Sequence, residues 1–226
     1  MKHSGILIRI LLFISTTLIQ AQDTAPYKGL FSLTESTQKD FDVAMQKQEV
    51  FLFRDTASHP RRHDTIQLRI ESSPKIPLIK SDIITESDDM VDYEYLGQMK
   101  SIHSYLLLGH FYEWETYYMI DKISGYETEL LNSIPVPSPN AHWLAALNIH
   151  LDAFYDDPAY VEIFDISQEN PEMILEIIPG VWLPAAVVWK NENTLLIQAE
   201  KKMDRFPDAS GEIPTPVYGY YSLVLQ

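Results

Sequence analysis

Residues 119–144, MIDKISGYETELLNSIPVPSPNAHWL, contain three apolar runs that are separated by turn-forming residues. The first run ends at Asp121 and is followed by Ser124-Gly125, and the second covers Tyr126 to Leu131. The third begins at His142, after the segment Pro137-Ser138-Pro139-Asn140. Because Gly, Pro, Asn and Ser favour turns and the runs are short, this stretch predicts strand, turn, strand, loop, strand.

Short β-branched and aromatic runs continue along most of the chain. In residues 64–71, Ile66, Leu68 and Ile70 alternate with polar residues, which predicts a half-buried strand. The runs group into three sheet units at residues 49–80, 91–131 and 136–178, and into a partial unit at 185–225. The partial unit lacks one strand, which residues 27–33 could supply.

One helix is predicted, around residues 36–47. Thr37 and Asp40 have the spacing of a capping box, and Phe41, Ala44, Met45 and Gln48 follow a helical period. The predicted fold class is therefore all-β with a single short helix.

A weak internal repeat relates two of the sheet units. Ile120-Asp121 and Phe164-Asp165 end equivalent strands 44 residues apart, close to the length of one four-stranded blade. Over about residues 95–200 the chain resembles β-propeller repeat proteins of the WD40 and TolB-like kind, in which a strand ending in Asp precedes a turn. It departs from them in having Asn140-Ala141 where Asp-Gly is typical, and it has no Trp-Asp dipeptide.

This resemblance implies a small propeller-like array of about four to five antiparallel sheets, in which the N-terminal strand joins the last sheet and closes a ring. Closure would remove exposed sheet edges. A two-sheet β-sandwich or an incomplete propeller is the alternative architecture.

The N-terminus has the plan of a secretory signal peptide. Lys2 and Arg9 precede a mostly apolar run of about ten residues, and Ala21 offers a small residue for cleavage. That run is well short of the roughly 20 residues that span a bilayer. We therefore expect residues 1–21 to be removed, residues 22–226 to form one all-β domain, and the mature chain to have no integral membrane segment.

The composition indicates where the protein is located and which classes of partner it can bind. The chain has no Cys and no Asn-x-Ser/Thr acceptor, which favours a bacterial periplasmic or secreted protein. Its formal charge is −15, and loss of Lys2 and Arg9 with the leader leaves 15 basic against 32 acidic side chains, a net −17. Nucleic acid is excluded as a main partner because it repels a protein of this charge.

An aromatic and acidic segment supplies the candidate ligand-binding residues. They are Tyr112, Glu113, Trp114, Glu115 and Tyr117. Flat aromatic faces beside carboxylates suit sugar rings and cationic side chains. Two acids on one solvated strand face are the simpler interpretation.

A second acidic segment supplies the candidate metal ligands. Asn148, Asp152, Asp156 and Asp157 lie between two predicted strands and carry the oxygen ligands that calcium prefers. No complete calcium-binding template is present, so an acidic surface loop is the alternative. No other cofactor is predicted.

Catalytic templates are absent from the sequence. It contains no nucleophile elbow, no Gly-rich phosphate loop and no His-Glu-x-x-His motif. We therefore expect a non-catalytic binding module of the bacterial cell envelope whose ligand is a protein, a peptide or a glycan. The alternative is an exported glycan-acting hydrolase with catalytic carboxylates such as Glu113 or Asp157. The sequence leaves the oligomeric state open.

Overall fold

The computed structural model describes residues 31–73, 78–81, 91–111, 114–130, 133–148, 159–168, 170–179, 182–201 and 216–226, together with short strands at 9–12, 14–15 and 18–19. With 58% of the described residues in strands and one α-helix among them, the all-β prediction is confirmed. In this described part, no helix has the length and apolar composition that a membrane crossing requires.

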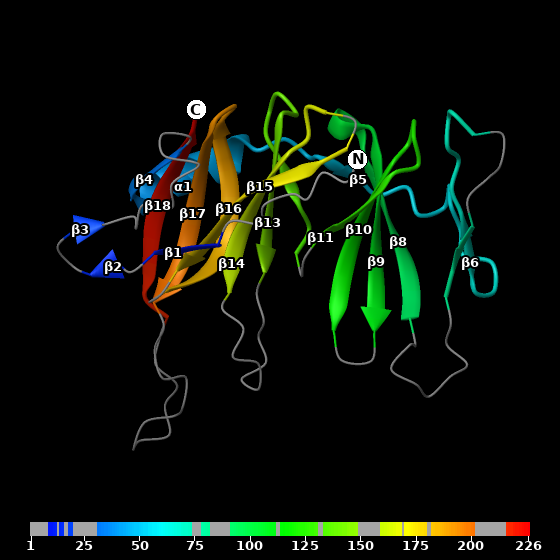
Figure 1. Ribbon diagram of the computed structural model, residues 1–226, viewed down its shortest axis with the longest axis horizontal. Coiled ribbons are helices and arrows are strands. Elements are labelled where there is room, and N and C mark those ends of the chain that lie inside the picture. The colour runs from blue at the N-terminus through cyan, green and yellow to red at the C-terminus, as the bar shows by residue number, and fades with distance from the viewer. Residues whose placement is uncertain are drawn as a thin grey trace, which may run out of the picture.

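Four sheets account for nearly all the strands, and we number them in their order across the molecule (Figure 1). Sheet I contains β16 (Trp182–Asn191), β17 (Thr194–Lys201), β18 (Tyr218–Leu225) and β4 (Phe31–Glu35). Sheet II contains β1 (Arg9–Leu12), β15 (Glu172–Pro179), β14 (Tyr160–Asp165), β13 (Trp143–Asn148) and β12 (Val136–Pro137). Sheet III contains β11 (Glu127–Leu130), β10 (Glu115–Asp121), β9 (Ser104–Phe111), β8 (Val91–Met99) and β5 (Leu52–Phe53). Sheet IV contains β6 (Thr65–Gln67) and β7 (Leu78–Lys80), and β2 (Ile14–Ser15) pairs separately with β3 (Leu18–Ile19).

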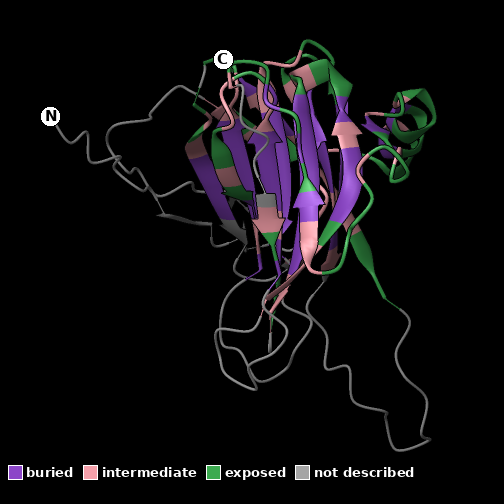
Figure 2. Ribbon diagram, turned by 90° about the vertical axis from the view of Figure 1, so that its right-hand side faces the viewer, coloured by how far each residue is buried: buried purple, intermediate pink, exposed green. Residues whose placement is uncertain are grey.

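The sheets pack face to face, so the central strands are buried on both sides. One core, between sheets I and II, includes Val187 and Ile163, and a second, between sheets II and III, includes Leu144 and Leu106. A third core joins sheet III to sheet IV through residues such as Leu107. Strands buried on both faces carry continuous apolar runs. Figure 2 shows this burial along the strands, with exposed residues gathered at their ends.

The two outer faces of the row are also covered, and the row stays open. Helix α1 (Gln38–Lys47) packs Phe41 and Ala44 against Val188 and Leu196, on the face of sheet I that points away from sheet II. At the other end of the row, sheet IV covers sheet III. Since neither terminal sheet has a bare apolar face left, the described sheets satisfy their burial without meeting in a ring.

The predicted sheet units agree with the observed ones in three of four cases. Residues 91–131, 136–178 and 185–225 form sheets III, II and I. The partial unit receives its missing strand from β4, which pairs antiparallel with β18. This strand overlaps the predicted residues 27–33 at 31–33, and residues 27–30 are outside the described residues. The prediction that residues 49–80 form one separate sheet is wrong. Among the described residues of this unit, β6 pairs with β7, whereas β5 pairs with β8 and belongs to sheet III.

The N-terminal segment contributes one strand to a sheet. Strand β1 lies parallel to β15 at the edge of sheet II, with Arg9 opposite Glu176 in the register. Cleavage after Ala21 stays a prediction.

The helix begins where the capping pattern predicted. The Thr37 hydroxyl accepts a hydrogen bond from the Asp40 backbone N–H at 3.1 Å and donates one to Asp40 Oδ2 at 2.7 Å. Phe41 and Ala44 are buried as expected, whereas Met45 is exposed because its side of the helix faces away from sheet I.

Replacing this capping residue should have a modest effect on stability. We expect Thr37→Ala to lower the free energy of unfolding by about 1 kcal/mol, since an N-cap hydroxyl satisfies an otherwise orphaned backbone N–H. Urea unfolding measures the change. Thr34→Ala on the exposed side of β4 is the control, and an equal loss in both variants would contradict the capping role.

Candidate functional site

The tight turns of sheets I, II and III lie on one side of the molecule, at the same end of their strands, and we call this side the turn end. It comprises residues 100–103 and 122–126 of sheet III, 138–142 and 166–171 of sheet II, and 191–193 of sheet I. Each of these turns connects neighbouring antiparallel strands, so its position is fixed by the sheet beneath it.

Two equivalent strands end in an aspartate that organises the following turn. Asp121 Oδ1 accepts hydrogen bonds from Ser124 N at 2.6 Å, Ser124 Oγ at 2.8 Å and Ile123 N at 3.0 Å. Asp165 Oδ1 accepts from Ser167 Oγ at 2.6 Å and from Ser167 N at 2.9 Å. The repeat seen in the sequence therefore corresponds to the same turn chemistry in adjacent sheets.

The turn between β12 and β13 is stabilised by its own polar side chains. Ser138 Oγ accepts from Trp143 N at 2.9 Å and from His142 N at 3.2 Å, and it donates to Asn140 Oδ1 at 2.8 Å. Asn140 thus forms the turn without an Asp-Gly pair. The Trp143 indole N–H donates to Asn193 Oδ1 at 3.4 Å, which ties this turn to sheet I.

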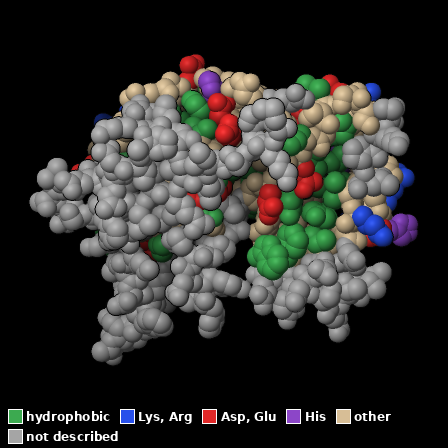
Figure 3. Space-filling model, in the orientation of Figure 1, with side chains coloured by type: hydrophobic (Ala, Val, Ile, Leu, Met, Phe, Trp, Pro, Cys, Tyr) green, Lys and Arg blue, Asp and Glu red, His purple; other side chains and the backbone are tan. Residues whose placement is uncertain are grey.

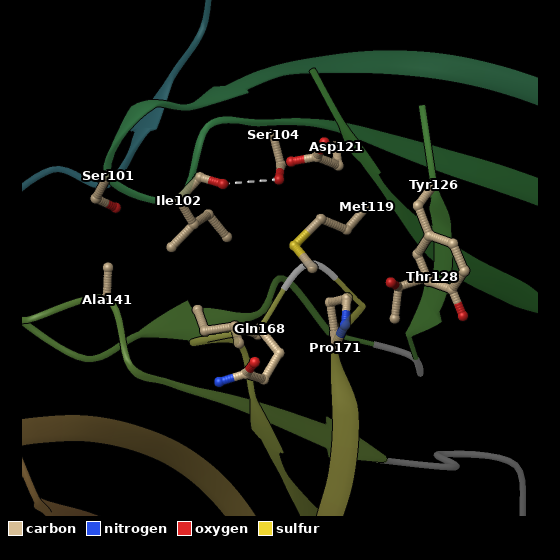
Figure 4. Close-up of a pocket in the computed structure, with 11 residues that line it drawn as sticks. Ser101, Ile102, Ser104, Met119, Asp121, Tyr126, Thr128, Ala141, Gln168 and Pro171 are labelled. Atoms are coloured by element: carbon tan, nitrogen blue, oxygen red, sulfur yellow. Dashed lines mark hydrogen bonds between the residues drawn. The ribbon is translucent and has the colours of Figure 1, made fainter. Parts of the chain in front are cut away.

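A pocket of about 240 Å³ opens at the turn end between sheets II and III (Figure 4). Its lining includes Ser101, Ala141 and Gln168 from the turns, and Ser104, Met119 and Thr128 from the strands. The Ser104 hydroxyl is already used, because it donates to the Ile102 carbonyl oxygen at 3.0 Å. The pocket therefore combines an apolar part with polar groups near its mouth.

Exposed apolar side chains lie beside this pocket. Tyr126 lines it and is 44% exposed, and Ile123 in the same turn is 53% exposed. Among the lining residues only Asp121 carries a carboxyl group, and that group holds its own turn. The lining therefore does not contain the pair of carboxyl groups that glycoside hydrolysis needs.

The aromatic and acidic residues expected to bind a ligand lie at the opposite end of sheet III, where β9 and β10 are joined. Trp114 is 47% exposed and stacks on Phe111 with ring centroids 4.9 Å apart. Glu115 Oε1 lies 2.8 Å from His110 Nδ1. Tyr117 is half-buried, and burial, followed by the nearby Glu115 charge, raises its pKa. Tyr112 and Glu113 are outside the described residues. Of the other residues, Trp114 stacks on Phe111, which packs against the core between sheets III and IV, whereas Tyr117 packs against the core between sheets II and III. The two aromatic side chains therefore lie on opposite faces of sheet III, and the structure does not bring the predicted set together.

The expected calcium ligands are not tested by the structure. Asn148 is buried at the end of β13, and Asp152, Asp156 and Asp157 are outside the described residues. Within the described part of the chain, no cluster of three or more His, Asp or Glu side chains could hold a metal ion.

Sequence reasoning missed a buried pair of carboxyl groups in sheet II. Glu162 on β14 and Glu176 on β15 are direct cross-strand neighbours, and they are only 6% and 4% exposed. Burial, followed by the negative charge of Glu176, raises the pKa of Glu162 to about 8. Each is a single acid inside an apolar run, and that pattern in successive strands was the available signal.

Surface charge matches the acidic composition. On the face shown in Figure 3, acidic side chains lie among hydrophobic ones near the middle of the molecule, and the basic ones lie mostly at its right-hand edge. Such a surface attracts cationic groups more readily than anionic ones. Comparison with known proteins finds no matching family, no matching curated protein and no matching solved structure.

Proposed function

We propose that this chain is a non-catalytic binding module of the bacterial cell envelope, exported by its N-terminal leader, which holds a protein or peptide partner at the turn end. The observation that carries the proposal is the pocket between sheets II and III, whose lining includes the exposed aromatic side chain of Tyr126. A rigid pocket on converging turns, flanked by an aromatic side chain, is how many binding surfaces hold an anchor residue.

The pocket's size favours one anchor side chain over a whole small molecule. Pockets that enclose small-molecule ligands measure about 300–1,000 Å³, and this one measures about 240 Å³. Ser101, Thr128 and Gln168 offer hydrogen bonds to a polar tip, and Met119 offers an apolar wall. With a net charge of −15 on the chain, a partner with basic residues is favoured.

Glycan binding and glycan hydrolysis are the alternatives. The flat Trp114 ring and the Glu115 carboxylate at the other end of sheet III suit a sugar. The lining of the described pocket has a single carboxyl group, that of Asp121, so this pocket does not support the hydrolase alternative.

We also propose that the row of sheets is an opened relative of the β-propeller. Two features support this: β4, from the first half of the chain, completes the last sheet beside β18, and Asp121 and Asp165 make equivalent turns in adjacent sheets. In a propeller the first and last sheets would then meet, and here α1 covers the face where they would join.

Filling the pocket should weaken binding. We expect Thr128→Trp to weaken the binding of an anchor peptide by tenfold or more, because the indole occupies the space that the anchor side chain needs. The measurement is a thermal-shift panel on the exported protein with short basic peptides and peptidoglycan fragments. A ligand at 100 times its dissociation constant stabilises the folded state by about 2.7 kcal/mol.

The matched control is Thr34→Trp on the exposed side of β4, away from the turn end. It should bind like the unmodified protein. Equal binding by Thr128→Trp and the unmodified protein would remove the pocket from the proposal, and a response to glycan fragments that Trp114→Ala removes would favour the glycan alternative.

A further inference from the structure

The outer edge of β15 accepts a strand. Strand β15 is eight residues long and forms the end of sheet II on its outer side, apart from β1, which pairs with it in parallel over Arg9–Leu12 and Glu176–Pro179. A long edge strand offers a row of backbone donors and acceptors, and an extended segment placed beside it continues the sheet. The structure shows that this edge has the geometry to do so.

Three residues that lie opposite one another on neighbouring strands of sheet II indicate which side chain a strand added at the β15 edge should carry. The register places Glu162 opposite Glu176, and Glu176 opposite Arg9. In the chain that still carries β1, both carboxyl groups are more than nine-tenths buried. Two neighbouring buried carboxyl groups are costly to charge together, and a cation at the next position in the row lowers that cost. The edge is therefore selective for a basic residue at this position.

Loss of the leader would change the occupant of the edge. Strand β1 lies within residues 1–21, so cleavage after Ala21 removes it from β15. We propose that in the exported protein the edge of β15 binds an extended peptide segment by strand addition, with a basic residue of that segment opposite Glu176 and apolar residues following it. This inference rests on the proposed export.

We expect the peptide that binds this edge to resemble β1 in sequence, because it takes the place of β1 beside β15. Residues 9–12 read Arg-Ile-Leu-Leu, and their backbone pairs with Glu176–Pro179 in a parallel register. A second copy of the chain is a poorer occupant, because two chains with a net charge of −17 each repel one another. A basic peptide is attracted by the same charge.

The test uses the exported protein, produced with its own leader, and a synthetic peptide of residues 8–13 (IRILLF) as the probe. Intact mass first shows whether the chain begins at Gln22. Amide hydrogen exchange is then followed over residues 172–179 with and without the peptide. We expect exchange there to slow in the presence of the peptide, because strand addition gives the edge amides hydrogen-bonding partners.

Charge variants test whether Glu176 selects a basic residue in the bound peptide. We expect Glu176→Gln, or a peptide carrying Arg9→Glu, to weaken peptide binding about tenfold or more, while Glu172→Gln on the exposed side of the same strand binds within twofold of the unmodified protein. The exchange measurement on the unmodified protein needs no variant, so it decides the question even where Glu176→Gln fails to fold.

The outcomes separate the two proposals. A chain that retains residues 1–21 after export overturns the cleavage step and with it this use of the edge. A chain that begins at Gln22 but shows unchanged exchange with saturating peptide overturns strand addition and leaves export intact. Protection of residues 172–179 in a dimer without peptide overturns the peptide proposal in favour of a second copy.

Discussion

Gly97→Ala should lower the free energy of unfolding by about 2–4 kcal/mol, one of the two largest effects expected in this protein. Gly97 lies at the bulge where β8 shifts register against β9, and its φ of +147° is in the region that favours glycine. A Cβ at this position would lie 2.5 Å from the Phe53 backbone oxygen and 3.2 Å from the Arg54 Cα. Since β5 is held there by pairing with β8, the backbone has to move.

Urea unfolding of Gly97→Ala and of a matched control measures the effect. The control is Gly219→Ala on β18, where the nearest atom to an added Cβ is the Tyr221 hydroxyl at 3.1 Å, the far end of a side chain. We expect that variant to change stability by about 1 kcal/mol or less. Equal midpoints for Gly97→Ala and the unmodified protein would show that β5 does not approach β8 in this way.

Glu162→Gln should remove a strong pH dependence of stability. The pKa of Glu162 is raised to about 8, first by burial and then by the charge of Glu176, whereas the same carboxyl group titrates near 4.5 when the chain is unfolded. Between these values the folded protein holds a proton that the unfolded chain has lost. The stabilisation is therefore complete below about pH 4.5 and is lost as the pH rises through about 8.

The measurable consequence is a slope in the free energy of unfolding. Between about pH 5.5 and pH 8.5 we expect Glu162→Gln to remove a decline of about 2–4 kcal/mol, because glutamine keeps the shape and has no proton to lose. Urea unfolding across this range gives the slope. Glu172→Gln, an exposed acid on β15, should keep the decline, and an unchanged slope in Glu162→Gln would show that this carboxyl group is charged in the folded protein.

The strand pattern made most of the fold predictable. Ile66, Leu68 and Ile70 are buried as their alternation indicated, and the turns after Asp121 and at Asn140 form as their side chains suggested. Turn chemistry and hydrophobic alternation act between near neighbours in the chain, so the residues themselves specify them. The assignment of β5 to sheet III was not predictable in this way, since two residues of strand can pair with any available edge.

The candidate site was harder to predict from the sequence than the fold was. The pocket takes Ser104 and Met119 from sheet III and Gln168 from a turn of sheet II, and none of these residues belongs to a motif. Trp114 and Glu115 stood out because aromatic and acidic residues are adjacent there, yet they lie at the opposite end of the sheet from the pocket. Adjacency in the chain places residues on one strand, and it does not determine which sheets meet across a pocket.

By itself, the sequence determined an all-β chain with one capped helix, the limits of three sheets, the strand that completes the last of them and an acidic surface. Those features depend on local propensity, periodicity and charge. Only the tertiary structure decided that the sheets stand in an open row, that a pocket forms between sheets II and III, and that Glu162 and Glu176 are buried side by side. These features depend on the packing of faces from distant segments, which becomes fixed when apolar surfaces find one another and exclude water.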